Sequence, residues 1–304
     1  MQYKELGSTG EKIPAIGIGT WKLRTANADV VPAIKEGFGL GMKFVDTAEM
    51  YGTEDMVGEA VHGEKGIFIA TKVSPDHFHY KDVKNACGRS LKELGVKRID
   101  LYQLHWPNSR IPIAETMKAM EELVEEGKIR HIGISNFSVE EMEDAMAALK
   151  THEIVSNQLE YSLLVRDIED EVLGYCRKNK MTVIAYSPLA RGLLFEPRNN
   201  GLLQVLLEIG KKRRKSAAQV ALAWVISKAD VVTIPKAANV EHMRENAGAS
   251  EIKLTAAEID RINGFLGDLS ERPVTERLNK FTKYTASFWS PVMRFREKVR
   301  RKRR

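Results

Sequence analysis

Residues 43–52, KFVDTAEMYG, combine a short apolar run with a polar end. Phe44 and Val45 lead into Asp46, and Tyr51 follows just before a glycine. The apolar pair is typical of a buried strand, and the glycine indicates a turn. An acid and a phenol therefore stand just past the end of a predicted strand. The fold depends on whether other strands end in the same way.

Seven further apolar runs occur along the chain, and the segments between them show helical periodicity. The eight predicted strands lie in AIGIGTW (15–21), KFVDTA (43–48), GIFIATK (66–72), RIDLYQLHW (98–106), KIRHIGISNF (128–137), EIVSNQLEYS (153–162), MTVIAYSPL (181–189) and DVVTIPK (230–236).

The segments between the strands read as helices. Residues 80–96 repeat apolar or small residues at roughly the 3.6-residue helical period. Ser138, with Glu141 three residues later, predicts a capping box at the start of another helix. Strands that alternate with helices in this way predict a (β/α)8 TIM barrel, formed as a single domain by residues 1–270 with an N-terminal β-hairpin. A doubly wound open sheet is the alternative.

Polar or aromatic residues stand at the carboxyl end of every predicted strand. In chain order they are Thr20 and Trp21, Asp46, Lys72, His105 and Trp106, Ser135 and Asn136, Gln158, Tyr186 and Ser187, and Lys236. A barrel gathers all these ends on one face, so we expect the side chains to converge in one cleft. Ordinary strand endings and helix caps are the alternative explanation for each residue taken alone.

The acid, the phenol and two further residues suggest proton transfer. A free phenol has a pKa near ~10, and a neighbouring ammonium such as that of Lys72 would lower it. Asp46 can hold Lys72 by a charge-assisted hydrogen bond. His105 can orient a carbonyl oxygen or help move its proton. We therefore predict that Tyr51 donates a proton to a carbonyl.

Two other readings of the acid and the lysine stay open. Asp46 and Lys72 can form a buried ion pair that only braces adjacent strands. Lys72 can also form a Schiff base, as in an aldolase.

Proton donation to a carbonyl requires an electron source. No metal site is predicted, because His77 and His79 lack accompanying Cys or acidic ligands and read as loop residues. A nicotinamide cofactor is the natural hydride donor. The glycine-rich stretch 37–42 precedes a strand instead of following one, so it is not a dinucleotide fingerprint. Phosphates would then bind in the loops at 187–192 and 234–248, as is common in barrels.

These motifs together resemble the aldo-keto reductase superfamily, in its prokaryotic branches, over roughly residues 1–270. The matching motifs, in the family's order, are GTW (19–21), DTAEMYG (46–52), ATK (70–72), LHWP (104–107), GISNF (133–137), NQLEYS (157–162), AYSPLARG (185–192), IPK (234–236) and EN (245–246).

The resemblance implies a barrel that reduces aldehydes or ketones with NADP(H) bound in an extended form. Tyr51 would be the catalytic acid, with Asp46, Lys72 and His105 supporting it. The cofactor site would comprise Gly19, Thr20, Asp46, Ser135, Asn136, Gln158, Tyr186, Ser187, Leu189, Lys236, His242, Glu245 and Asn246. Within it, Ser135, Asn136 and Gln158 would hold the carboxamide of the nicotinamide, and Tyr186 would stack on its ring. Ser187 and Leu189 would contact the pyrophosphate, and Glu245 and Asn246 the adenine. Trp21 and Trp106 would line the substrate pocket, unless they are ordinary packing at the barrel rim.

The phosphate end of this site departs from the family pattern. NADP-preferring members usually follow the lysine of the last strand with a serine and place an arginine six residues after that lysine. Here Ala237 and His242 occupy these places. Lys236 remains, but as a point charge without the bidentate fork of an arginine. NADP(H) is our expected cofactor, and NAD(H) is the alternative.

Charge is distributed unevenly along the chain. Residues 271–304 hold 12 Lys/Arg and 3 Asp/Glu, whereas the other 270 residues hold 35 and 38. The segment 281–304 mixes aromatic with basic residues, which suits an anionic membrane surface. Packing over the pocket or in an oligomer, nucleic-acid binding and a solvated tail are the alternatives for this segment, and nucleic acid ranks last among them.

Composition indicates a globular protein with 43% apolar and 29% charged residues. No secretory signal or membrane span is recognisable, and Cys87 and Cys176 read as buried thiols. We expect a cytoplasmic monomer, with peripheral association at the inner membrane face as an option through its tail. A nicotinamide-binding redox sensor with little turnover is the alternative to an enzyme.

Overall fold

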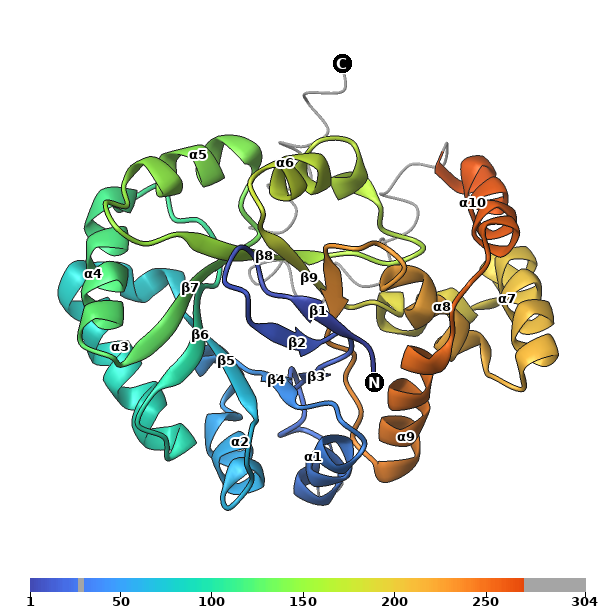
Figure 1. The fold of residues 1–304 in the computed structure, drawn as a ribbon, viewed down its shortest axis with the longest axis horizontal. Coiled ribbons are helices and arrows are strands. Elements are labelled where there is room, and N and C mark those ends of the chain that lie inside the picture. The colour runs from blue at the N-terminus through green and yellow to red at the C-terminus, as the bar shows by residue number, and fades with distance from the viewer. Residues whose placement is uncertain (27–29, 271–304) are drawn as a thin grey trace.

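The fold is a closed barrel of eight parallel strands. The computed structural model describes residues 1–26 and 30–270, so the predicted tail at 271–304 lies outside the described residues. The strands are β3 (Ile18–Gly19), β4 (Phe44–Asp46), β5 (Phe68–Val73), β6 (Ile99–Leu104), β7 (Ile129–Ser135), β8 (Ile154–Glu160), β9 (Thr182–Tyr186) and β10 (Val231–Thr233). They neighbour one another in sequence order (Figure 1).

The first and last segments of the barrel meet and close it. A parallel bridge joins Ile16 to Thr233, and Gly19 N donates a hydrogen bond to Pro235 O at 3.1 Å. A Cβ atom on residue 19 would lie 2.5 Å from Ile234 O, so this approach requires a glycine. The predicted barrel is confirmed, and the open-sheet alternative is wrong.

Ten α-helices are present in the described residues, and most of them surround the sheet. They are α1 (Val30–Gly39), α2 (Glu54–Val61), α3 (Tyr80–Leu94), α4 (Ile113–Glu125), α5 (Val139–Ala147), α6 (Val172–Lys178), α7 (Asn200–Arg213), α8 (Ala217–Val225), α9 (Val240–Gly248) and α10 (Ala256–Ser270). Helices α7 and α10 pack together at one side of the molecule (Figure 1).

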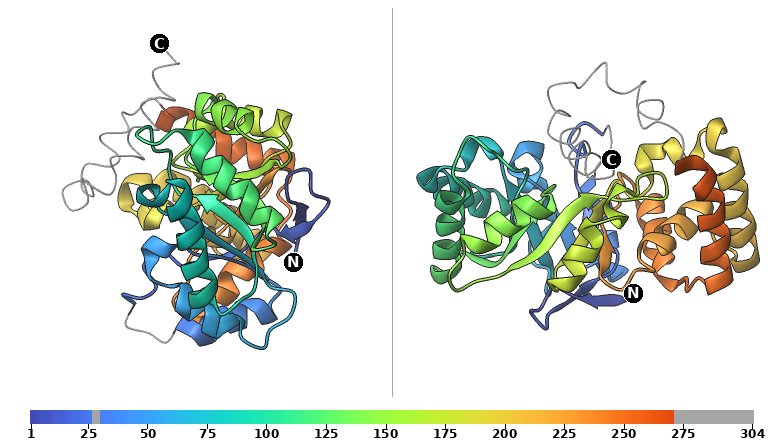
Figure 2. Two further views of the ribbon diagram at one scale, coloured as in Figure 1. Left: turned by 90° about the vertical axis from the view of Figure 1, so that its left-hand side faces the viewer. Right: turned by 90° about the horizontal axis from the view of Figure 1, so that it is seen from above.

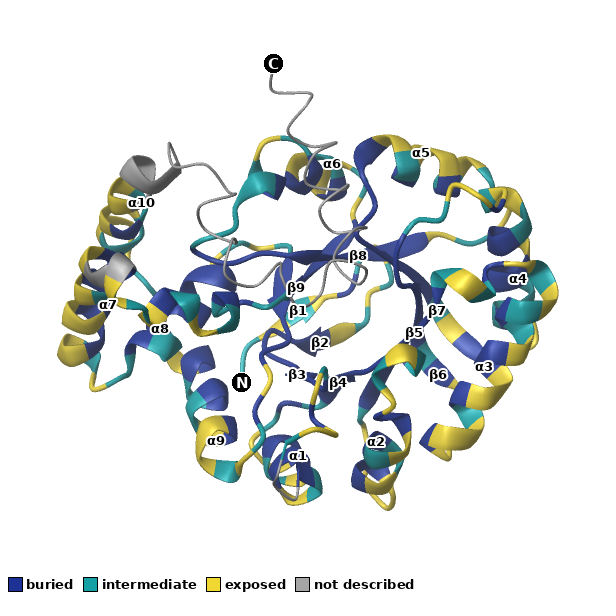
Figure 3. Ribbon diagram, turned by 180° about the vertical axis from the view of Figure 1, so that it is seen from behind, coloured by how far each residue is buried: buried dark blue, intermediate teal, exposed yellow. Residues whose placement is uncertain are grey.

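The structure contains the predicted helix cap and the two predicted buried thiols. The capping box at α5 is present, with Ser138 accepting from Glu141 N and Glu141 accepting from Ser138 N. Cys87 and Cys176 are buried free thiols, as predicted. Exposed residues lie on the outer faces of the helices, and buried residues fill the strands (Figure 3).

The predicted N-terminal hairpin closes one end of the barrel. It consists of β1 (Tyr3–Glu5) and β2 (Lys12–Pro14), which pair antiparallel. Figure 2 shows the hairpin at one end of the barrel. Leu6 and Ile13 belong to the same buried cluster as Phe44, Leu101 and Val232 of the barrel interior. This apolar plug fills the barrel at the hairpin end, and the polar carboxyl ends of the strands gather at the opposite end.

Candidate active site

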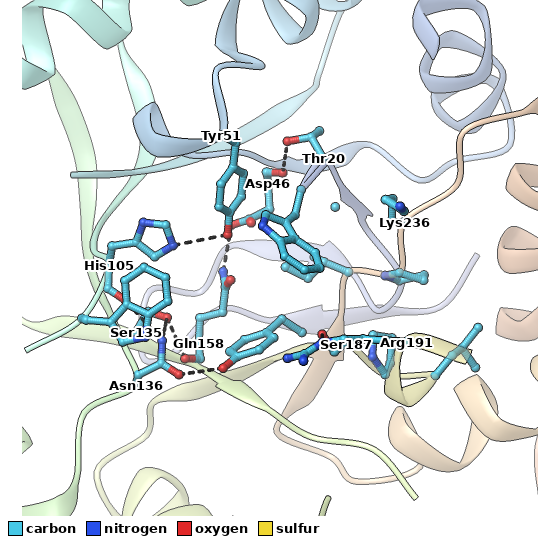
Figure 4. A pocket seen from close by; sticks show the side chains of 18 of the residues that line it. Thr20, Asp46, Tyr51, His105, Ser135, Asn136, Gln158, Ser187, Arg191 and Lys236 are labelled. Carbon is cyan, nitrogen blue, oxygen red and sulfur yellow. Dashed lines mark hydrogen bonds between the residues drawn. The ribbon is translucent and has the colours of Figure 1, made fainter. Parts of the chain in front are cut away.

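A cavity of about 360 Å³ lies at the carboxyl ends of the strands. The predicted residues that line it are Gly19, Thr20, Trp21, Asp46, Tyr51, His105, Trp106, Ser135, Asn136, Gln158, Tyr186, Ser187, Leu189 and Lys236. The predicted convergence is therefore confirmed for seven of the eight strand ends, and Lys72 is the exception (Figure 4).

Four predicted site residues do not line this cavity. Lys72 is fully buried and is bonded to Asp46, one of the lining residues. His242, Glu245 and Asn246 lie on α9, which follows the last strand. There His242 Nδ1 is 3.3 Å from Glu245 Oε2, and the Asn246 side chain is buried.

Tyr51 and His105 face each other across the site. Tyr51 ends the short 3₁₀ turn Glu49–Tyr51 that follows β4, and His105 follows β6. The Tyr51 hydroxyl lies 3.3 Å from His105 Nε2 (Figure 4). The His105 ring also stacks on Trp106, with 3.9 Å between the ring centroids. The phenol and the imidazole are thus held where both can reach one small ligand.

Asp46 and Lys72 form a buried ion pair beside this phenol. Lys72 Nζ donates to Asp46 Oδ1 at 2.5 Å and to Thr47 O at 2.8 Å. The Lys72 side chain is 0% exposed and the Asp46 side chain 2% exposed. The same ammonium lies 4.9 Å from the centroid of the Tyr51 ring. The pair therefore links β4 to β5, and its cation also lies beside the phenol.

Proton affinities in the site differ from the sequence-based expectation. Burial raises the pKa of Tyr51 well above its usual value, and the Asp46 carboxylate and the neighbouring Tyr186 raise it further. The sequence predicts a lowered pKa for Tyr51, whereas the pKa is raised in this structure, and burial is the largest cause. Burial, helped by Lys72, holds the pKa of His105 well below its usual range. At neutral pH the phenol therefore keeps its proton and the imidazole is uncharged.

Polar groups on β7, β8 and β9 form a connected network along the cavity. Asn136 Nδ2 donates to His105 O at 3.2 Å and to Ser135 Oγ at 2.9 Å. Tyr186 Oη donates to Asn136 Oδ1 at 2.9 Å, and Ser135 Oγ donates to Gln158 O at 2.9 Å. Amide and hydroxyl groups of this kind can bind a carboxamide.

Comparison with known proteins identifies the family. A model of the Aldo/keto reductase family matches residues 15–266. The chain belongs to the aldo-keto reductase family. Methylglyoxal reductase YeaE of Escherichia coli (strain K12) is 40% identical over 270 residues, which cover 85% of this chain and 93% of that protein.

Solved structures of aldo-keto reductases share the fold. The thermostable aldo-keto reductase Tm1743, in complex with the inhibitor epalrestat, has a TM-score of 0.81 and 41% identity, covering 87% of this chain and 100% of its own. An aldo-keto reductase from Klebsiella pneumoniae in complex with NADPH has a TM-score of 0.79 and 36% identity, covering 88% and 96%.

Two residues of this aldo-keto reductase site were missed in the sequence. Arg191 lines the cavity, where its guanidinium donates to Glu160 Oε1 at 3.2 Å and lies 5.8 Å from the Trp21 ring centroid. Gln103 is fully buried and bonds to Asp46. A polar residue within the apolar run of β6 was the available signal for Gln103. Arg191 lay within a loop already predicted to hold phosphates.

A metal-binding cluster and a membrane-spanning helix are both absent from the described residues. Within residues 1–26 and 30–270, no group of three His, Cys, Asp or Glu side chains could hold a metal ion. His77 Nδ1 lies 3.0 Å from Glu49 Oε1, and His79 Nδ1 lies 3.3 Å from Glu115 Oε1. In the same part of the chain, none of the helices has the length and apolar character needed to cross a bilayer.

Proposed function

We propose that this protein reduces small aldehydes or ketones to alcohols, with NADPH as the hydride donor and Tyr51 as the proton donor. The observation that carries the proposal is the approach of the Tyr51 hydroxyl to His105 Nε2 at 3.3 Å inside the cavity. Lys72 lies beside the phenol ring, and the raised pKa of Tyr51 keeps the transferable proton in place.

The polar residues of the cavity fit a nicotinamide dinucleotide. Ser135, Asn136 and Gln158 would hold the carboxamide, and Tyr186 would stack on the ring. Bound NADPH would supply the hydride. The Klebsiella pneumoniae relatives are complexes with NADP or NADPH, which supports this choice.

Residues that include two basic side chains fit the phosphates of NADPH. Ser187, Leu189 and Arg191 would face the pyrophosphate. Lys236 would meet the 2′-phosphate, with His242 near it, and Glu245 and Asn246 would contact the adenine. Figure 4 shows Ser187, Arg191 and Lys236 on one side of the site and His105 on the other. Burial lowers the pKa of Lys236, and the nearby Lys22 lowers it further, so two cations lie close together at this end of the site.

The chain's own residues would then carry out the proton transfer. Tyr51 Oη would donate its proton to the substrate carbonyl oxygen, and the Lys72 ammonium would stabilise the resulting phenolate. Uncharged His105 would orient the carbonyl through Nε2. Trp21 and Trp106 offer apolar walls, so we infer an uncharged substrate. A 2-oxoaldehyde such as methylglyoxal fits, and YeaE is named for its reduction.

Contacts of Lys72 weigh against a Schiff-base aldolase. Its Nζ is enclosed by Asp46 Oδ1 and Thr47 O, and Lys72 is not among the residues that line the cavity. An amine must reach the substrate carbonyl to form a Schiff base. The reductase function is therefore preferred.

Nucleotide binding and turnover test the proposal together. We would titrate the protein with NADPH and NADH by tryptophan fluorescence and assay methylglyoxal reduction beside the variant Tyr51→Phe. We expect tighter binding of NADPH, unchanged NADPH binding by the variant, and a kcat lower by about 10²–10⁴-fold. Tight binding with negligible wild-type turnover would favour a redox sensor. Binding of neither nucleotide would overturn the reductase function.

A further inference from the structure

We propose that Gln103 is a positioning residue that keeps Asp46 in place when Gln158 turns toward a bound nicotinamide. The inference rests on the proposed function. It concerns the hydrogen bonds of a side chain that does not line the cavity.

Both carboxylate oxygens of Asp46 accept hydrogen bonds in the structure. Oδ1 accepts from Lys72, whereas Oδ2 accepts from Gln158 Nε2 at 2.8 Å and from Gln103 Nε2 at 3.0 Å. The two glutamines are also bonded to each other, with Gln158 Nε2 lying 3.2 Å from Gln103 Oε1. One anionic oxygen therefore has two amide donors.

The barrel provides a space that fits the Gln103 side chain. Gln103 pairs with Gly133 in the register of β6 and β7. A Cβ atom on residue 133 would lie 2.8 Å from Gln103 Cγ and 2.9 Å from Ser156 Oγ. An apolar cluster that includes Leu101 fills the barrel interior. A buried amide costs free energy unless it is hydrogen-bonded, and the bonds of Gln103 to Asp46 and Gln158 meet this requirement.

Access to the cavity distinguishes the two amides. Gln158 lines the cavity, but Gln103 is fully buried and does not. If the Gln158 Nε2 group turns to donate to a ligand in the cavity, its bond to Asp46 Oδ2 is given up. Gln103 then remains as the donor to that oxygen. Asp46 thus keeps its orientation, and through Oδ1 it keeps Lys72 beside Tyr51.

This arrangement links Gln103 to both binding and turnover. Without the second donor, nucleotide binding would leave Asp46 Oδ2 unsatisfied in a buried site. An unpaired buried charge is unfavourable, so Gln158 would resist release. Loss of the Gln103 amide should therefore weaken nucleotide binding and also slow proton transfer from Tyr51.

The first test replaces Gln103 by methionine, which has a similar length and no donor. For Gln103→Met we expect the Kd for NADPH to rise about fivefold or more and kcat to fall about tenfold, as for loss of one hydrogen bond to a buried charge. The matched control is Ser156→Ala in the same interior layer, because Ser156 Oγ has no hydrogen-bond partner in the described structure. It should leave both values within about twofold.

A second variant tests the bond itself through pH. In the Gln103→Glu variant, the protonated side chain at position 103 can donate to Asp46 Oδ2. The ionised side chain at this position repels the Asp46 carboxylate. Its kcat should fall as pH rises from about 6 to about 9, while the wild-type value stays level. This comparison is internal to one variant, so it holds even if Gln103→Met folds poorly.

The outcomes separate this proposal from the proposed function. Wild-type values of Kd and kcat in Gln103→Met, or a level pH profile in Gln103→Glu, would overturn the role of Gln103 alone. A wild-type protein that neither binds NADPH nor reduces the aldehyde would overturn the proposed function and this role with it.

Discussion

At the scale of single residues, Tyr51 and His105 are in contact, yet their pKa values are displaced in opposite directions. Burial is the main cause for both, since it disfavours the charged form of each group. Asp46 adds to the rise for Tyr51, and Lys72 adds to the fall for His105. Both side chains are therefore neutral over a wide range of pH.

The pH dependence of catalysis follows from these directions. Reduction requires the protonated phenol, so activity is present below the pKa of Tyr51 and is lost only as pH rises through that raised value. We expect kcat/KM for aldehyde reduction to be level from about pH 6 to about pH 9, measured by initial rates. Alcohol oxidation is the control, because it needs the phenolate and should speed up as pH rises. A loss of reduction centred near pH 7 would contradict this assignment.

Single residues also show how far the sequence could predict the site. Asp46, Lys72 and His105 were predictable, because a barrel gathers the ends of its strands on one face. The raised pKa of Tyr51 was not predictable, since it depends on the depth of burial and on the distance to the Asp46 carboxylate. Gln103 escaped because its partner Asp46 lies on another strand, 57 positions away.

At the scale of elements, the N-terminal hairpin is tied to the end of α8 by one lysine. Lys4 Nζ donates to Ile226 O and Val231 O, both at 2.6 Å, and also to Lys228 O. Ile226 is the C-cap of α8, and Val231 begins β10. The hairpin thus holds together the helix end and the strand that follows it.

Replacing this lysine should destabilise the barrel without touching the site. We expect Lys4→Met to lower the free energy of unfolding by about 2 kcal/mol, because hydrogen bonds from a charged group are lost. Urea denaturation followed by circular dichroism measures the change. Lys12→Met, at an exposed position of the same hairpin, is the control and should stay within about 0.5 kcal/mol. Equal effects of the two variants would contradict the role of Lys4.

Elements were more predictable than the contacts between them. The eight strands and the capping box of α5 follow from local patterns of apolar residues and caps. The link from Lys4 to Val231 spans 227 positions, and no local pattern encodes it. Closure at Gly19 likewise depends on the distant backbone of Ile234.

At the scale of the whole molecule, charge separates along the chain. The barrel and the tail differ in sign, with 35 Lys/Arg against 38 Asp/Glu before residue 271 and 12 against 3 after it. The family match ends at residue 266, so the segment 271–304 adds to the barrel a sequence outside that match. We propose that residues 281–304 of this segment bind anionic membrane surfaces and leave catalysis to the barrel.

Vesicle binding tests that division of roles. Each Lys or Arg near an anionic surface contributes about 1 kcal/mol, and salt screens this attraction. The full chain should therefore sediment with phosphatidylserine-containing vesicles at low salt and be released at about 0.5 M NaCl. A variant ending at residue 270 should stay in solution and reduce the aldehyde at the wild-type rate. Neutral phosphatidylcholine vesicles are the control. The shortened chain should not bind because the barrel alone carries more acidic than basic groups. Equal binding to both kinds of vesicle, or binding by the shortened chain, would contradict an electrostatic role for the tail.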